Sequence, residues 1–190
     1  MQARRVTSAG RPLIGTDLRL VDDRGMEVPV GTVGEVVARG PQIAKGYLNL
    51  SEETSSHFRD GWFHTGDMGL LDRDGYLYLL DRKKDMVITG GENVYCLEVE
   101  DVLARHPDVA EAAVFGIPDE VYGEALMAVL VPRAGRRPGA EELVAHCRQF
   151  IGGYKIPRRI ALSPDLPRNS LGKVLKGELR QRFADSKVLP

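Results

Sequence analysis

The stretch Asp81-Arg82-Lys83-Lys84-Asp85 separates two parts of the chain that have different sequence patterns. Upstream of it, short apolar segments alternate with turns that combine aspartate and glycine, such as Asp22-Asp23-Arg24-Gly25 and Asp72-Arg73-Asp74-Gly75. Downstream of it, segments with a helical period alternate with nearly continuous apolar segments. The contrast predicts an α+β fold, with a mostly β region first and a small α+β domain after the charged stretch.

The upstream region predicts short strands and one helix. Strands are expected where apolar residues lie between glycine-rich turns. We expect Ser51 to cap the helix, because a serine hydroxyl accepts backbone N–H groups there, and Glu52 and Glu53 suit the first turn. The predicted strands cover residues 18–20, 35–38 and 76–80, and the predicted helix covers residues 51–58.

The downstream region predicts the order strand, helix, strand, strand, helix, strand, helix. Its two central strands are nearly continuous apolar runs, which is typical of strands covered by helices. His106-Pro107 should end the first helix, because the residue before a proline disfavours the helical conformation. The predicted elements cover residues 86–88, 97–106, 110–117, 125–131, 141–151, 159–162 and 174–183.

The composition excludes several classes of protein. The 190 residues include 26 Lys and Arg and 27 Asp and Glu, and this balance excludes a globally basic nucleic-acid binder. Two cysteines, Cys96 and Cys147, exclude a disulfide framework and a four-cysteine metal site. No apolar run approaches the roughly 18–20 residues of a membrane span, and the first residues lack the apolar run of a secretory signal. We therefore expect a soluble, cytoplasmic protein without a metal site, a membrane span or a nucleic-acid partner.

Three charged positions are candidates for binding or catalysis, and each has two interpretations. Asp67 follows small residues that suggest a turn, so its carboxylate either accepts hydrogen bonds from a ribose diol or stabilises that turn. Arg82 has a planar group that suits phosphate or ribose oxygens, but it also belongs to a solvated charge run. Lys173 lies beside a glycine before a helix, where its ammonium could meet an anion or simply be exposed.

Two further segments are equally ambiguous. Gly90-Gly91 permits positive φ and close backbone approach, yet a pair of glycines is usually only a turn, and no GxGxxG fingerprint surrounds it. Residues 133–159 carry seven basic and two acidic side chains. This basic stretch either faces a polyphosphate ligand or forms a solvated face.

Six segments, in this order and spacing, resemble the adenylate-forming acyl-CoA synthetase superfamily. The resemblance extends from about residue 10 to residue 183. The segments are GEVVARG (34–40), KGYL (45–48), GWFHTGD (61–67), DRKKDMVI (81–88), GGENVY (90–95) and PRNSLGK (167–173).

The resemblance implies an activity for the complete enzyme. Such enzymes activate a carboxylic acid with ATP to an acyl-adenylate and release pyrophosphate, and most members then transfer the acyl group to CoA and release AMP. It therefore implies a carboxylic acid (fatty or related acyl), ATP, Mg²⁺ and CoA as substrates or cofactors of the complete enzyme. We expect this chain alone to bind none of them.

The resemblance also assigns roles to the charged candidates. Asp67 matches the aspartate that binds the ribose, and Arg82 matches an arginine that contacts the nucleotide. Lys173 matches the catalytic lysine that bridges carboxylate and phosphate oxygens during adenylation. One ammonium there would reduce the repulsion between two anions and stabilise the charge that develops at phosphorus.

The remaining matches imply a moving domain. Lys84 matches the hinge about which the small domain rotates, and Gly90 and Gly91 match the segment that lines the CoA tunnel. Rotation would withdraw the lysine and bring the two glycines into place. The resemblance thus implies a partial barrel-like subdomain over residues 1–83, which ends the large adenylating domain, and a mobile α+β lid over residues 85–190.

The chain also departs from the family pattern. The family's phosphate loop, adenine-packing segment and magnesium-holding acidic residue have no counterpart, and Cys96 stands where many relatives carry proline. We expect only the C-terminal portion of a ligase, whether an isolated piece, a gene fragment or one half of a split enzyme whose partner is the missing N-terminal region. Two alternatives stay open: an adenylating unit that serves a carrier protein, and a non-catalytic lid that docks on a partner domain. Uncovered apolar strand faces in residues 1–83 would favour self-association.

Overall fold

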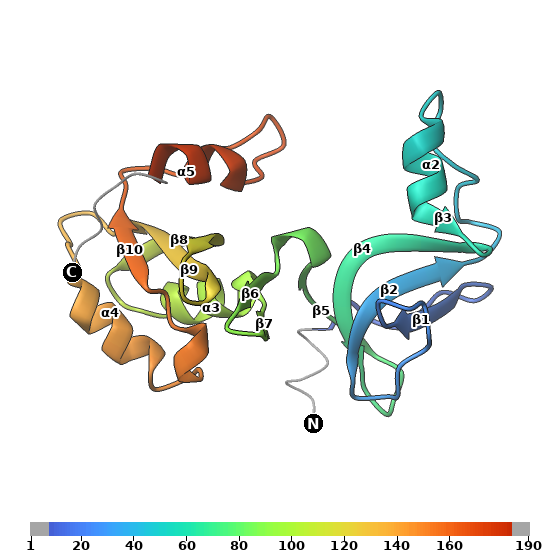
Figure 1. Ribbon diagram of the computed structural model, residues 1–190, viewed down its shortest axis with the longest axis horizontal. Helices are drawn as coiled ribbons and strands as arrows, with labels where there is room; N and C mark the ends of the chain where they lie inside the picture. Colours follow the sequence, from blue (N-terminus) through green and yellow to red (C-terminus); the bar gives the residue numbers. More distant parts are fainter. Residues whose placement is uncertain (1–7, 184–190) are drawn as a thin grey trace. The chain divides into compact units, whose positions relative to one another are not determined.

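The computed structural model describes residues 8–183 of the chain. These residues form two compact units that divide in the sequence between Lys84 and Asp85 (Figure 1). We call the upstream part unit 1 and the downstream part unit 2. Both units combine strands and helices, which confirms the predicted α+β class.

Unit 1 is built on an antiparallel sheet of five strands, in the order β1-β2-β4-β3, with β5 beside β4. The longest strand, β4, pairs with β2 on one edge and with β3 and β5 on the other. The sheet curls along β4 (Figure 1), which confirms the partial barrel-like shape. The elements are β1 (Asp17–Val21), β2 (Val33–Arg39), α2 (Ser51–His57), β3 (Phe58–Arg59), β4 (Trp62–Leu71) and β5 (Leu77–Arg82).

The strand β4 occupies residues for which the sequence predicted a turn, around His64-Thr65-Gly66-Asp67, and that prediction is wrong. Gly66 (φ +72°) and Gly69 interrupt the apolar alternation that marks a strand. Gly69 is required by packing, because an added Cβ would lie 3.0 Å from a methyl of Leu77 and 3.1 Å from a methyl of Val36. Pairing on both edges therefore forms a strand that local propensity does not indicate.

The helix α2 lies where the sequence placed it, but its first turn is bonded differently. Ser51 does not cap the helix, since the N-cap position is Leu50 and no side-chain cap forms. The hydroxyl of Thr54 donates to the carbonyl of Leu50 (2.7 Å), which already accepts the N–H of Thr54 (2.9 Å). The expected serine cap is therefore wrong, and no side chain takes its place.

Unit 2 is a five-stranded sheet with helices on both faces (Figure 1). Its strands follow the order β10-β9-β6-β7, with β8 on β9, and only the pairing of β10 with β9 is parallel. The elements are β6 (Val87–Thr89), β7 (Glu92–Val94), α3 (Cys96–Ala104), β8 (Val109–Asp119), β9 (Gly123–Pro132), α4 (Ala140–Cys147), β10 (Arg159–Leu162) and α5 (Lys176–Phe183).

Alternate residues of β9 belong to two different cores. Leu126, Ala128 and Leu130 pack with α3 and α4, whereas Met127 and Val129 pack with α5. Because both faces are buried, nearly every residue of the strand must be apolar, and this explains the continuous apolar run in the sequence. The helix and strand order predicted for this region is correct, except that β7 was not expected and α4 ends at Cys147 rather than near residue 151.

Unit 1 has a smaller core, centred on Leu20, Val36 and Leu77. Its exposed large apolar side chains lie mostly in loops, and among the described strands of this unit only β5 carries one, Leu79. The described strands of unit 1 therefore expose less apolar surface than expected, and self-association stays a prediction. No helix within residues 8–183 has the length and apolar character to cross a membrane.

Candidate functional site

Two of the predicted nucleotide-binding residues lie opposite each other in unit 1. The register of β4 against β5 pairs Asp67 with Arg82. The Nε atom of Arg82 lies 2.6 Å from Oδ1 of Asp67, in an ion pair whose side chains are 49% and 29% exposed. The two charges are therefore neutralised by each other and remain accessible to a ligand.

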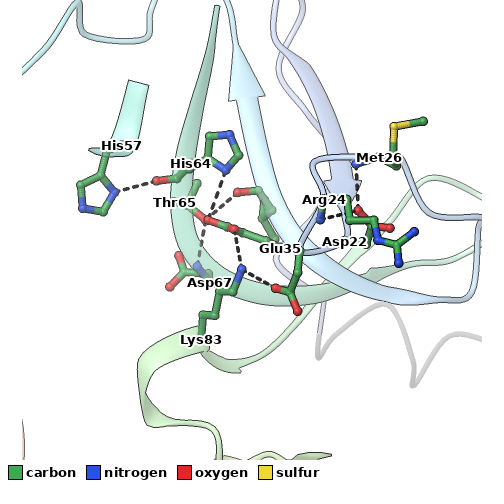
Figure 2. Close-up of polar contacts among 11 residues, drawn as sticks. Asp22, Arg24, Met26, Glu35, His57, His64, Thr65, Asp67 and Lys83 are labelled. Carbon is green, nitrogen blue, oxygen red and sulfur yellow. Dashed lines mark hydrogen bonds and ion pairs between the residues drawn. The ribbon is translucent and has the colours of Figure 1, made fainter. Parts of the chain in front are cut away.

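The backbone before Asp67 holds this carboxylate in place. The Thr65 hydroxyl donates to the carbonyl of Val36 (2.8 Å) and accepts the N–H of Asp67 (3.0 Å). Gly66, between them, has a φ of +72°, which a residue with a side chain rarely adopts. Figure 2 shows Thr65 and Asp67 on this segment of β4. Sequence reasoning identified Asp67 but missed this support.

A cluster of charges next to Lys84, the predicted hinge, was also missed by sequence reasoning. Lys83 donates to Oε2 of Glu35 (3.2 Å), as Figure 2 shows. The ammonium of Lys83 also lies 2.8 Å from Oδ1 of Asp23. His64 Nδ1 lies 3.4 Å from the other oxygen of Glu35. We call Asp23, Glu35, His64 and Lys83 the Glu35 cluster. Glu35 is separated from Lys83 by 48 residues, so no local pattern could have found the pair.

Burial and charge act in opposite directions on the Glu35 cluster. Burial alone would raise the pKa of Glu35, but the hydrogen bond and charge of Lys83, together with His64, lower it below its ordinary value. The hydrogen bond that Lys83 donates to Asp23 raises the pKa of Lys83, assisted by Glu35 and opposed by burial. Lys83 also lowers the pKa of Asp23. The cluster therefore holds Lys83 as a cation against unit 1.

Lys84 differs sharply from its neighbour. Both lie in a short 3₁₀ turn over Lys83–Asp85, at the boundary of the two units. Lys84 is exposed, and within residues 8–183 no hydrogen bond or ion pair holds its ammonium. The structure thus places a tethered lysine directly before an untethered one.

Gly90 and Gly91 form the turn between β6 and β7 in unit 2. The strands pair as far as Thr89 and Glu92, which leaves a two-residue turn in which both φ values are positive, +59° and +85°. The N–H of Gly90 donates to the backbone carbonyl of Tyr122 (3.0 Å). A Cβ added at Gly90 would lie 3.2 Å from the side-chain ring of Tyr122. The turn therefore requires glycine.

Lys173 lies in a second loop of unit 2, just before α5. Residues 168 and 174 form an isolated antiparallel bridge, so residues 168–174, which we call the Lys173 hairpin, make a compact turn. The side chain of Lys173 is exposed, and its ammonium has no bonded partner among the described residues. It is not buried in the core of the unit.

The basic stretch of residues 133–159 is partly neutralised. Arg136 lies 3.2 Å from Asp108, and Lys155 lies 2.6 Å from Glu98. Arg158 instead covers the ring of Tyr122, at 3.9 Å from its centroid. At least three of the seven basic side chains thus have partners within the chain, and the polyphosphate interpretation stays open.

The cavity beside the Glu35 cluster and the arrangement of metal-ligand side chains reveal no second functional site among the described residues. A cavity of about 230 Å³ opens beside the Glu35 cluster and is lined by neither Asp67 nor Arg82. Within residues 8–183, no group of three or more His, Cys, Asp or Glu side chains could hold a metal ion. The described residues alone thus supply no complete set of protein ligands for Mg²⁺, which usually keeps waters and substrate phosphates among its ligands. Mg²⁺ stays an expectation for the complete enzyme.

Two family models match the chain. The model of the AMP-binding enzymes matches residues 1–48, and the model of the AMP-binding enzyme C-terminal domain matches residues 98–173, ending at Lys173. The second match covers most of unit 2 from α3 onward.

Curated relatives and solved structures match nearly the whole chain. It is 46% identical over 181 residues to a feruloyl-CoA synthase of Amycolatopsis sp., which covers 95% of this chain and 37% of that protein. It is 46% identical over 187 residues to the medium/long-chain-fatty-acid–CoA ligase FadD8 of Mycobacterium tuberculosis, and this match covers 95% of this chain and 33% of that protein.

Solved structures of related enzymes also match this chain in fold. The o-succinylbenzoate CoA synthetase of Bacillus subtilis, solved with its acyl-adenylate intermediate, superposes with a TM-score of 0.90 at 37% identity, covering 100% of this chain and 38% of that one. The amide bond synthetase McbA of Marinactinospora thermotolerans superposes with a TM-score of 0.88 at 40% identity, and the match covers 95% of this chain and 37% of that one. The chain therefore spans about a third of the length of these relatives. Matched by both family models and by these relatives, it belongs to the AMP-binding, adenylate-forming enzymes.

Proposed function

We propose that this chain is the C-terminal part of an ATP-dependent carboxylic acid–CoA ligase, which forms an acyl-adenylate and then an acyl-CoA. One observation carries the proposal: relatives named as CoA ligases match 91–95% of the chain at 43–46% identity. Catalysis then requires an adenylating region that these 190 residues do not supply.

In this proposal Asp67 and Arg82 bind the nucleotide. A carboxylate accepts hydrogen bonds from both hydroxyls of a ribose, and a guanidinium has further donors for ribose or phosphate oxygens. Their ion pair orients both groups before the ligand arrives. Because each side chain is partly exposed, a ribose can reach the carboxylate without unfolding the sheet.

Lys173 is the catalytic residue of the first step. A carboxylate oxygen of the acid attacks the α-phosphorus of ATP, a P–O bond forms, and the bond to pyrophosphate breaks. Both reactants are anions, so an ammonium between them lowers their repulsion and stabilises the charge that develops in the transition state. An exposed lysine with no internal partner among the described residues is suited to this role, because no ion pair must be broken first.

Lys84 is the pivot, and Gly90 with Gly91 lines the path of CoA in the second step. There the CoA thiol gives up its proton to solvent and its sulfur attacks the acyl carbonyl. A C–S bond forms, and the bond from the acyl carbon to the AMP oxygen breaks, so that AMP leaves. The tethering of Lys83 by the Glu35 cluster supports Lys84 as the first residue free to rotate. The absence of side chains at the Gly90-Gly91 turn supports close passage of a slender chain.

The relatives support no particular acid. Ligases named for feruloyl, fatty-acid, 2-succinylbenzoate and indoleacetate substrates match at nearly equal identity. The acceptor has a second candidate, because an amide bond synthetase matches as closely in fold as the CoA ligases do. In that case an amine would attack the acyl-adenylate. The carrier-protein and docking alternatives have no comparable support.

A hybrid enzyme tests the proposal. This chain would replace the matching segment of the Bacillus cereus 2-succinylbenzoate–CoA ligase, to which it is 43% identical over 177 residues. We expect acid-dependent ATP–pyrophosphate exchange and, with CoA, formation of the thioester and AMP. A hybrid that binds ATP but supports no exchange would contradict the ligase function. Amide formation from an amine in place of thioester formation would establish the second candidate.

A further inference from the structure

The backbone of Lys173 is bonded on both sides to a single residue. The N–H of Lys173 donates to Oδ1 of Asn169 (2.9 Å), and the carbonyl of Lys173 accepts the N–H of Asn169 (2.9 Å). The same Oδ1 also accepts the N–H of Leu171 (3.0 Å), and the carbonyl of Asn169 accepts the N–H of Gly172 (2.9 Å). Asn169 thus forms hydrogen bonds with the backbone of Leu171, Gly172 and Lys173.

The Lys173 hairpin is also fixed to the sheet of unit 2. Arg168 donates to the carbonyl of Gly172 (2.7 Å) and forms an ion pair with Glu111 on β8. On the other side of the hairpin, Val174 packs against the core that β8 and β9 share with α5. The base of the hairpin is therefore anchored, whereas its tip depends on Asn169.

We propose that Asn169 is a positioning residue for the ammonium of Lys173, a role that rests on the ligase function proposed above. The Lys173 side chain has four rotatable bonds, so fixing its Cα is the main way in which the fold restricts the ammonium. A substitution that does not touch the reacting atoms can still displace a catalytic group by about 1 Å, and this displacement can reduce the rate about 10²-fold. Asn169 does not touch a reacting group and acts only through the backbone of Lys173.

The first test uses the 190-residue chain itself. Amide hydrogen exchange, measured by NMR, should be at least about tenfold faster at Leu171 and Lys173 in Asn169→Ala than in the wild type, because both N–H groups lose their acceptor. Asn169→Asp retains an acceptor oxygen and should restore the protection. Ser170→Ala is the matched control in the same hairpin and should change neither amide. Unchanged exchange in Asn169→Ala would overturn the proposal.

The second test measures the two half-reactions in the hybrid ligase. Asn169→Ala should slow adenylation about 10- to 100-fold and leave transfer to CoA from a supplied acyl-adenylate within about twofold. Asn169→Asp should recover at least half of the loss on a logarithmic scale. Equal slowing of both half-reactions would show a merely structural role, and an unchanged adenylation rate would show no positioning role. Either result would overturn the inference.

Failure of this inference is distinguishable from failure of the proposed function. If Lys173→Ala leaves adenylation unchanged, the catalytic assignment itself is wrong, whatever Asn169 does. If Lys173→Ala slows adenylation and Asn169→Ala does not, only the positioning role of Asn169 is wrong.

Discussion

The candidate charged residues of unit 1 and the candidate lysine of unit 2 differ in how their charges are held. In unit 1 the candidates Asp67 and Arg82 are paired with each other. Their neighbour Lys83 is paired with Glu35 (Figure 2). In unit 2 the hairpin holds the backbone of Lys173 and leaves its ammonium exposed. The difference suits the proposed roles: a preorganised pair recognises a ligand, whereas an ammonium that must enter and leave a site has no internal partner to give up.

The two units also differ in how they are packed. The sheet of unit 2 separates two buried cores and has helices on both faces. The sheet of unit 1 has one small core, and most residues of β4 are only half-buried. A domain that moves as a rigid body needs a core of its own, so unit 2 is the unit suited to act as a lid.

The largest expected effect concerns the unpaired charge of unit 2. In the hybrid ligase, Lys173→Ala should slow adenylation about 10²–10³-fold, or about 3–4 kcal/mol, by analogy with the loss of a charge-stabilising donor. ATP–pyrophosphate exchange measures this step. Arg105→Ala, which removes an exposed cation just after α3 in unit 2, is the control and should leave the rate unchanged. Equal effects of the two substitutions would contradict the specific role of Lys173.

The packing difference predicts unequal costs for the same substitution. Leu103→Ala, in the fully buried core of unit 2, should lower the free energy of unfolding by about 3–4 kcal/mol, and Leu20→Ala in unit 1 by about 2–3 kcal/mol. The single tryptophan, Trp62, lies in unit 1, so its fluorescence during denaturant unfolding reports that unit. Helical circular dichroism mainly reports unit 2, which contains α3, α4 and α5. Equal losses would contradict the contrast.

The adjacent lysines at the boundary should differ in stability. Lys83→Met leaves Glu35 buried without its cation. The cost of breaking a buried pair is about 3–5 kcal/mol, and because Lys83 is 38% exposed we expect about 1–3 kcal/mol. Lys84→Met should cost less than about 0.5 kcal/mol, since nothing described binds its ammonium. Denaturant unfolding followed at Trp62 compares them, and similar costs would remove the distinction between tethered and untethered lysine.

A proline at the pivot should separate the half-reactions. Proline fixes φ near −65° and removes an N–H, so Lys84→Pro should restrict rotation after the acyl-adenylate has formed. We expect thioester formation to be slowed about tenfold more than adenylation, and single-turnover measurements of each step in the hybrid ligase would show it. Equal slowing of both steps would count against Lys84 as the hinge.

The smallest effect is a pH dependence of unit 1. The lowered pKa of Glu35 contributes stability that is fully present above the ordinary value of 4.5 and is lost as the pH falls through the lowered pKa. The raised pKa of Lys83 acts on the alkaline side, where stability is lost as the pH rises through it. Unfolding followed at Trp62 should show the acid loss in the wild type and a weaker loss in Lys83→Met. An unchanged acid loss in Lys83→Met would assign the dependence to other carboxylates.

Sequence patterns were sufficient to predict the α+β class, the order of the elements in unit 2 except β7, and the family resemblance that the comparisons confirm. It succeeded where the information is local. The run of apolar residues in β9 and the Gly90-Gly91 turn each depend on neighbouring positions, and burial on both faces leaves a continuous signal. The candidate residues Asp67, Arg82 and Lys173 were likewise found by local motifs.

The contacts between residues far apart in the sequence could be read only from the folded chain. The strand β4 forms because β2, β3 and β5 supply hydrogen bonds along its edges, which no periodicity within residues 62–71 indicates. The pairing of Asp67 with Arg82 depends on the register of two strands, and the Glu35 cluster joins residues from separate elements. Hydrogen-bond register and burial are properties of paired segments. They become definite only when the chain has folded.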